Sequence, residues 1–136
     1  MKAYNKYASL QGNLVMVGFG SVGQAVLPLL FRHFEIHPKQ IRIISADANG
    51  EEIAREFGVA STYHVLTEKN YLSVLEPCLN KGDFLLNLSV DVSSLALIEL
   101  CWRLEVLISG YLHRAMARRL HRHVNICVTA VQLCSA

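Results

Sequence analysis

The chain has 136 residues, of which 52% are hydrophobic, and its formal net charge is +2. This length allows a single domain, and the apolar fraction excludes a chain that is disordered throughout. No apolar run reaches the length of a membrane-spanning helix, and the first residues lack the apolar stretch of a signal peptide. We therefore expect a cytoplasmic protein without membrane contact. The four cysteines have no metal-ligand spacing, so we interpret them as free thiols and expect no metal site.

Short apolar runs alternate with helical spacing along the chain, which predicts strands that alternate with helices. In chain order, the predicted elements are a strand at 13–18, a helix at 21–34, a strand at 41–45, a short helix at 51–57, a weak strand at 61–65, a helix at 67–80 that begins at Thr67, a strand at 84–88, a helix at 95–104 capped by Ser93 or Ser94, and the start of a strand at 105–108. This alternation predicts an α/β fold, a parallel sheet with helices on both faces. The carboxyl ends of its strands share one edge, where ligands bind.

A glycine-rich motif separates the first predicted strand from the first predicted helix. It consists of Gly18, Phe19, Gly20, Ser21, Val22 and Gly23. The first glycine makes the tight turn, the second lets a pyrophosphate approach the backbone, and the third lets the helix pack closely on the strand. The N-terminus of the helix adds unpaired N–H groups and a partial positive charge. In this setting the motif predicts a dinucleotide-binding site, and the alternative is a tight turn that binds no nucleotide.

An acidic residue, Asp47, follows the second predicted strand, 24 residues after Gly23. A carboxylate at this place accepts hydrogen bonds from the adenosine ribose and repels a 2′-phosphate, so it favours NAD over NADP as the cofactor. Arg42 lies on the strand itself and is poorly placed to bind a 2′-phosphate. The alternative role for Asp47 is a cap at the start of the next helix.

A polar run follows the fourth predicted strand, at the edge of the sheet that faces the cofactor. We expect Asn87, Leu88 and Ser89 to contact the cofactor on its nicotinamide side, with the two polar side chains bonding to the ribose or the substrate. We interpret Asp91, like Ser93 and Ser94, as a cap of the next helix, and His64 as a strand-end histidine. No Ser/His/Asp arrangement is visible, so the catalytic residues stay unassigned at this point.

The two motifs at 18–24 and 87–94, in this order, closely resemble those of bacterial homospermidine synthases, a family related to saccharopine dehydrogenases. The resemblance covers about residues 10–107 and implies a Rossmann-like NAD-binding domain over residues 1–107. It also implies an enzyme that moves an aminobutyl group between polyamines such as putrescine and spermidine, with a hydride passed transiently to bound NAD, and a homo-oligomer at full length. Two alternatives stay open: an NAD-dependent dehydrogenase of the saccharopine type, and a small NAD-sensing regulatory module.

Residues 108–136 depart from the family, which continues with a run resembling Y-[IL]-D-T-C-I-E-P-W. Here the chain has four arginines, three histidines, no lysine and no acid. A one-base shift of the reading frame allows a family-like run and forces a tryptophan from the codons of Met116 and Ala117. We therefore expect 108–136 to be an atypical basic tail that is out of frame, and not a nucleic-acid-binding patch. The alternative is a genuine basic C-terminal helix.

A chain that stops short of the family's later strands predicts an incomplete sheet. We expect the far side of the first strand to lack its neighbouring strands, which would expose apolar surface. The expected consequences are marginal stability, a tendency to associate, weak NAD binding and no turnover by this chain.

Overall fold

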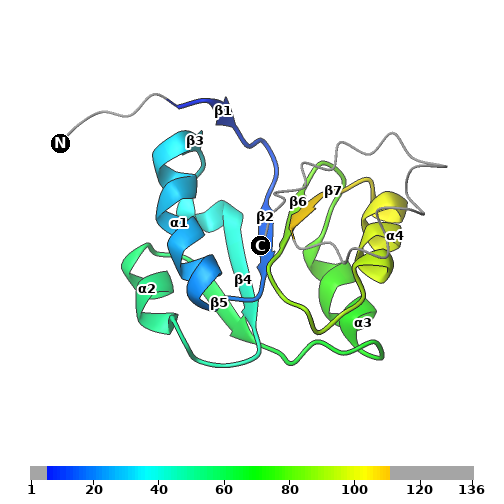
Figure 1. Cartoon of the computed structure of the whole chain (residues 1–136). Helices are drawn as coiled ribbons and strands as arrows, with labels where there is room; N and C mark the ends of the chain where they lie inside the picture. Colours follow the sequence, from blue (N-terminus) through cyan, green and yellow to red (C-terminus); the bar gives the residue numbers. More distant parts are fainter. Residues whose placement is uncertain (1–5, 111–136) are drawn as a thin grey trace, which may run out of the picture.

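A computed structural model describes residues 6–110 of the chain. In this part, five parallel strands form the main sheet and helices cover both of its faces (Figure 1), which confirms the predicted α/β class. The elements in chain order are β1 (Ala8–Ser9), β2 (Leu14–Val17), α1 (Ser21–His33), β3 (Phe34–Glu35), the 3-10 helix η1 (Pro38–Gln40), β4 (Ile41–Ser45), α2 (Glu51–Glu56), β5 (Ala60–Tyr63), α3 (Tyr71–Leu75), the 3-10 helix η2 (Glu76–Cys78), β6 (Phe84–Asn87), α4 (Ser94–Leu104) and β7 (Leu107–Gly110).

Strand β2 is the centre of the sheet, whose strand order is β5-β4-β2-β6-β7. Val17 pairs with Ile44 of β4 on one side and with Asn87 of β6 on the other. The expectation that one side of the first strand would lack a neighbour was therefore wrong, because residues 84–87 return to pair there. The order reverses direction across β2, and a parallel α/β sheet binds ligands outside the carboxyl ends of its strands at such a point.

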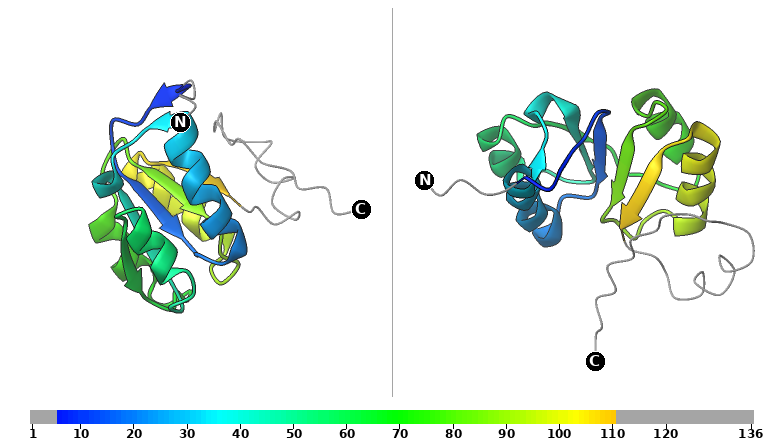
Figure 2. Two further views of the ribbon diagram at one scale, coloured as in Figure 1. Left: turned by 90° about the vertical axis from the view of Figure 1, so that its left-hand side faces the viewer. Right: turned by 90° about the horizontal axis from the view of Figure 1, so that it is seen from above.

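Each face of the sheet has its own apolar core. All four residues of the central strand β2 are therefore buried. Leu14 and Met16 belong to the core under α1 and α2, whereas Val15 and Val17 belong to the core under α3 and α4. The two helix pairs lie on opposite sides of the sheet in both views of Figure 2. Burial on both faces explains why the strand reads as an unbroken apolar run rather than as an alternating one.

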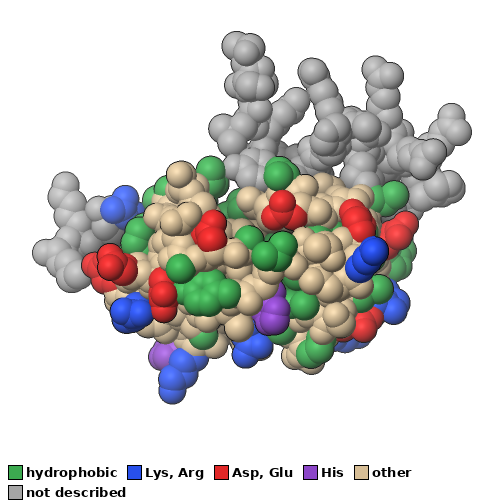
Figure 3. All heavy atoms as spheres, turned by 90° about the horizontal axis from the view of Figure 1, so that it is seen from below, with side chains coloured by type: hydrophobic (Ala, Val, Ile, Leu, Met, Phe, Trp, Pro, Cys, Tyr) green, Lys and Arg blue, Asp and Glu red, His purple; other side chains and the backbone are tan. Residues whose placement is uncertain are grey.

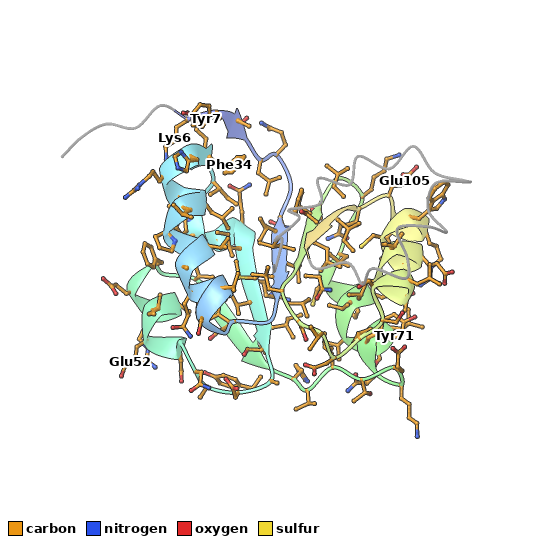
Figure 4. The ribbon with its side chains drawn as sticks, in the orientation of Figure 1. Lys6, Tyr7, Phe34, Glu52, Tyr71 and Glu105 are labelled. Carbon is orange, nitrogen blue, oxygen red and sulfur yellow. The ribbon has the colours of Figure 1, made fainter. Side chains whose placement is uncertain are left out.

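The N-terminal segment folds over the end of α1, which the sequence did not predict. Strands β1 and β3 pair in parallel, and the N–H of Tyr7 donates to the carbonyl of His33 at 2.8 Å. The Lys6 ammonium donates to the carbonyl of Phe31 in the last turn of α1 and to that of Phe34, the C-cap residue, where carbonyls lack helical partners. Figure 4 shows Lys6, Tyr7 and Phe34 together at this end of the helix. Strands of two residues are too short to give a periodic signal.

The helix predicted at 67–80 is shorter in the structure, where α3 gives way to the 3-10 helix η2. One local feature at each end shortens it. Asn70 closes a turn before the helix, since its side chain accepts from the Thr67 N–H at 2.7 Å and donates to the Val65 carbonyl at 2.8 Å. Pro77 lacks the N–H that would continue the α-helical ladder.

Helix α4 begins where predicted but is capped differently. Ser93 occupies the N-cap position, and its side chain makes no capping hydrogen bond. Instead, the backbone N–H of Ser93 donates to the Glu68 carboxylate at 2.8 Å. The loop before α3 therefore supplies the acceptor that holds the start of α4.

Strand β7 continues beyond the predicted domain boundary at residue 107. It pairs with β6 in register from Leu107 to Gly110. The rest of the predicted tail, 111–136, lies outside the described residues, so its reading frame stays a prediction.

An apolar groove of about 550 Å³ lies beside α1 on the face of β6 and β7 opposite to α4. Within residues 6–110, no helix covers this face of the two strands. Groove-lining side chains include Val22, Val26 and Leu30 of α1, Phe84 and Leu86 of β6, and Leu107 of β7. Leu107 is 56% exposed. The expected apolar exposure is thus present, on one sheet face rather than at the side of the central strand.

The two cysteines in the described part of the chain are free thiols with different surroundings. Burial on α4 raises the pKa of the Cys101 thiol to about 12, whereas Cys78 is half-buried. Since the thiolate is the reactive form, we expect iodoacetamide at pH 8 to modify Cys78 and to spare Cys101 in the folded chain. Peptide mass spectrometry measures both sites, and equal labelling of Cys101 in folded and urea-unfolded chain would contradict the prediction. The raised pKa of Cys101 also predicts a pH dependence of stability. Between pH 9 and 12 the thiol ionises in the unfolded chain but not in the folded one, so the free energy of unfolding should fall as the pH rises through that range.

Candidate dinucleotide site

A pocket of about 250 Å³ opens outside the carboxyl ends of the central strands, on the face that Figure 3 shows from below. It is lined by Val17, Gly18, Phe19, Gly20, Ile44, Ser45, Ala46, Asp47, His64, Leu66, Leu88, Ser89, Val90 and Asp91. The pocket thus joins the turn after β2 to the segments that follow β4, β5 and β6. Hydrophobic and acidic side chains are mixed on this face of the molecule (Figure 3).

Gly18 makes the turn that ends β2, with a φ of +89°. Its N–H donates to the carbonyl of Ile44 at 2.8 Å, which ties the end of β2 to β4. A Cβ at Gly18 would lie 3.0 Å from the carbonyl of Leu88 and from the nitrogen of Ser89. Both the positive φ and the close approach of the backbone that follows β6 therefore require glycine at this position.

Gly20 and Gly23 differ in what surrounds them. A Cβ at Gly20 would meet nothing within 4 Å, so the space above this residue is open to a ligand. Gly20 is also the N-cap of α1 and makes no side-chain capping bond, which leaves the first-turn N–H groups available. A Cβ at Gly23 would lie 3.0 Å from the carbonyl oxygen of Gly18, so this glycine allows close packing of helix on turn.

The Phe19 side chain is used for packing rather than for the pocket surface. Phe19 is 3% exposed, and its ring lies within 3.0 Å of where a Cβ of Gly23 or Gly50 would be. The Gln24 side-chain amide donates to the Phe19 carbonyl at 3.2 Å, which ties the turn to the first part of α1. Phe19 therefore closes the space between the start of α1 and the loop before α2.

Asp47 lies two residues beyond β4, at the rim of the pocket. Its Oδ1 accepts a hydrogen bond from the backbone N–H of Asn49 at 2.9 Å, so the carboxylate also shapes the turn before α2. A carboxylate has two oxygens and about four acceptor sites, and one such bond leaves capacity for ribose hydroxyls. The predicted ligand role and the alternative role in the turn are therefore compatible.

The structure brings part of the predicted site together. Of the residues predicted to bind the cofactor, those that line the pocket are Gly18, Phe19, Gly20, Asp47, Leu88 and Ser89. Ser21 and Gly23 lie in the first turn of α1, and Val22 lines the apolar groove instead. Asn87 is 2% exposed, and its Oδ1 accepts from the Ser89 N–H at 3.2 Å. Its side chain shapes the turn after β6.

Asp91 and His64 also line the pocket, although the sequence pattern favours a helix cap for Asp91 and a strand-end residue for His64. The Asp91 Oδ2 accepts from the Ser89 hydroxyl at 2.9 Å, and Asp91 lies two residues before the N-cap of α4. The spacing of Ser89 and Asp91 is the only signal that could have indicated this pair. His64 follows β5, and its backbone N–H donates to the Ser45 carbonyl at 2.9 Å.

The pocket has little fixed positive charge. None of its described lining residues is a lysine or an arginine, so the N–H groups at the start of α1 are its main means of holding phosphate. In residues 6–110, no group of His, Cys, Asp or Glu side chains could hold a metal ion. No helix in that range is long and apolar enough to cross a bilayer.

Comparisons with known proteins identify the family of this domain. The family model of the saccharopine dehydrogenase NADP-binding domain matches residues 14–131. Homospermidine synthase from Mesorhizobium japonicum is 38% identical over 104 residues (74% of this chain, 21% of the relative), and that from Blastochloris viridis is 38% identical over 97 residues (69% and 20%). The crystal structure of homospermidine synthase from Legionella pneumophila in complex with NAD superposes with a TM-score of 0.72 at 39% identity, covering 75% of this chain and 22% of that one.

The chain spans about a fifth of the length of the relatives that it matches. The relatives confirm the resemblance to homospermidine synthases that the two motifs indicated. Since the family model covers most of the sequence, the chain belongs to the saccharopine dehydrogenase NADP-binding domain family.

Proposed function

We propose that this domain binds NAD across the carboxyl ends of its strands. The adenosine half lies over β4 and β5, the pyrophosphate at the N-terminus of α1, and the nicotinamide half towards the end of β6. The open space above Gly20, directly in front of unpaired helix N–H groups, is the observation that carries the proposal. The Legionella relative is described as a complex with NAD, which supports it.

The pocket favours NAD over NADP, although the family description names NADP. A 2′-phosphate on the adenosine ribose would lie beside the Asp47 carboxylate and be repelled. No arginine or lysine among the described lining residues could compensate for this repulsion. Charge at the rim of the pocket therefore selects the cofactor.

Replacing Asp47 by asparagine should weaken NAD binding about tenfold, since asparagine keeps an acceptor oxygen and the step from a charged to a neutral hydrogen bond costs roughly 1–1.5 kcal/mol. The same change should reduce the preference for NAD over NADP. Isothermal titration of both nucleotides measures the two effects. Glu52→Gln serves as the control, because Glu52 carries the same charge on the outer side of α2 (Figure 4) and does not line the pocket. An Asp47→Asn variant that binds both nucleotides like the parent chain would exclude this role.

We propose further that the domain serves an aminobutyl transfer between polyamines, as the names of the relatives suggest. Bound NAD would supply a hydride acceptor that later returns the hydride. The described residues supply the NAD cradle, and none of them is assigned to the polyamine. We therefore expect the chain to bind NAD without accumulating NADH in the presence of putrescine. Absorbance at 340 nm tests this, and net NADH formation would favour a dehydrogenase instead.

A further inference from the structure

We propose that His64 positions the adenine ring of the dinucleotide, an inference that rests on the proposed NAD site. His64 is the first residue after β5, next to the strand that leads to Asp47. In the proposed binding mode, Asp47 holds the ribose, and the base attached to that ribose extends over the neighbouring strand end. That strand end is where His64 lies.

The backbone around His64 is held from two sides. Its N–H donates to the Ser45 carbonyl at 2.9 Å, which fixes the end of β5 to the end of β4. The preceding residue, Tyr63, bonds through its hydroxyl to Glu51 in the first turn of α2, and this bond raises the pKa of Tyr63 and lowers that of Glu51. The Tyr63 side chain is therefore engaged by α2, whereas His64 follows the end of the strand. It lines the pocket together with Leu66.

Adenine is a flat ring with an apolar face, and proteins bind bases by stacking planar side chains on that face. Among the described pocket residues only Phe19 and His64 carry rings. Phe19 is 3% exposed and is packed between the positions of Gly23 and Gly50, so it cannot present its face to a ligand. The exposed imidazole of His64 is the ring that remains for the base.

The test uses the full chain and three ligands: NAD, ADP-ribose and nicotinamide mononucleotide. His64→Ala should weaken NAD and ADP-ribose about five- to tenfold, as expected for the loss of one stacked ring, and leave the mononucleotide unchanged. His64→Phe keeps a stacking face and should restore most of the affinity. His37→Asn is the control, because His37 is an exposed histidine that precedes β4, at the opposite edge of the sheet.

The outcomes separate this inference from the proposed function. If the parent chain binds none of the three ligands, both are overturned. If it binds NAD and His64→Ala binds equally well, only the role of His64 is overturned. Equal weakening of the mononucleotide would also overturn it, since that result indicates a general disturbance of the pocket. Upfield shifts of the His64 imidazole protons on addition of ADP-ribose would support stacking directly.

Discussion

Replacing Gly20 by alanine should abolish measurable NAD binding and leave the stability of the chain unchanged. A Cβ at Gly20 meets no protein atom within 4 Å, and its φ of −79° is accessible to alanine, so the fold tolerates the change. In the proposed complex, however, the methyl group would occupy the space that the pyrophosphate needs to reach the helix N–H groups. Titration with NAD and urea denaturation of the same variant measure the two quantities.

Gly18→Ala is the matched variant with the opposite expectation. Here an alanine side chain would have to adopt a φ of +89° and would meet the backbone of Leu88 and Ser89 at 3.0 Å, so we expect a loss of about 1–3 kcal/mol in the free energy of unfolding. The same added methyl group is thus expected to abolish NAD binding at Gly20 and to lower the stability of the fold at Gly18, although both residues belong to one turn. If Gly20→Ala binds NAD like the parent chain, the pyrophosphate does not lie over this turn.

Asp83→Ala should destabilise the chain by about 3 kcal/mol, because it removes two hydrogen bonds to a buried carboxylate. Asp83 is 3% exposed. Its Oδ1 accepts from the N–H of Asn13 at 2.9 Å, and its Oδ2 accepts from the N–H of Asn80 at 2.9 Å. The carboxylate therefore joins the start of β2 to the turn before β6, at the edge of the sheet opposite to the pocket.

Urea denaturation measures the effect of Asp83→Ala. Asp91→Ala is the control, since Asp91 is exposed and bonds to a side chain of its own loop, and it should change the free energy of unfolding by less than about 0.5 kcal/mol. Asp83→Asn, which keeps one acceptor oxygen, should fall between the two. A loss for Asp83→Ala no larger than that for Asp91→Ala would show that the buried bonds contribute little.

The fold was predictable where local pattern and global packing demand the same residues. The apolar run ending at Gly18 indicates a strand from the sequence alone. A strand that is buried on both faces needs the same apolar residues. Helix α3 was less predictable, because its limits depend on Asn70 and Pro77, whose effects compete with the helical spacing of 67–80. The pairing of β1 with β3 joins segments 25 or more residues apart and leaves no local signal.

The lining of the pocket could be predicted at the turn after β2 and at the end of β4, and less well beside them. The motif from Gly18 to Gly20 has a fixed mechanism that spacing reveals, and Asp47 follows from the same mechanism. The position of His64 depends on β5 pairing beside β4, which a weak strand pattern does not specify. The polar strand-end position of Asn87 predicts a contact with the cofactor, and the structure shows in addition that its side chain bonds within the turn after β6. Polarity alone does not show which way a side chain points.

The apolar groove beside α1 also limits how this unit can be reused in protein engineering. A nucleotide-binding unit grafted onto a new catalytic partner keeps its solubility only if the graft hides its apolar surfaces. Residues 6–110 hide both cores under the four helices but leave the β6–β7 face of the groove open. A chimera built from this range would therefore need a new apolar helix over that face, or polar replacements at exposed positions such as Leu107. The residue boundaries of such a graft should therefore be chosen so that the apolar surfaces are covered, and not by where the nucleotide-binding motif ends.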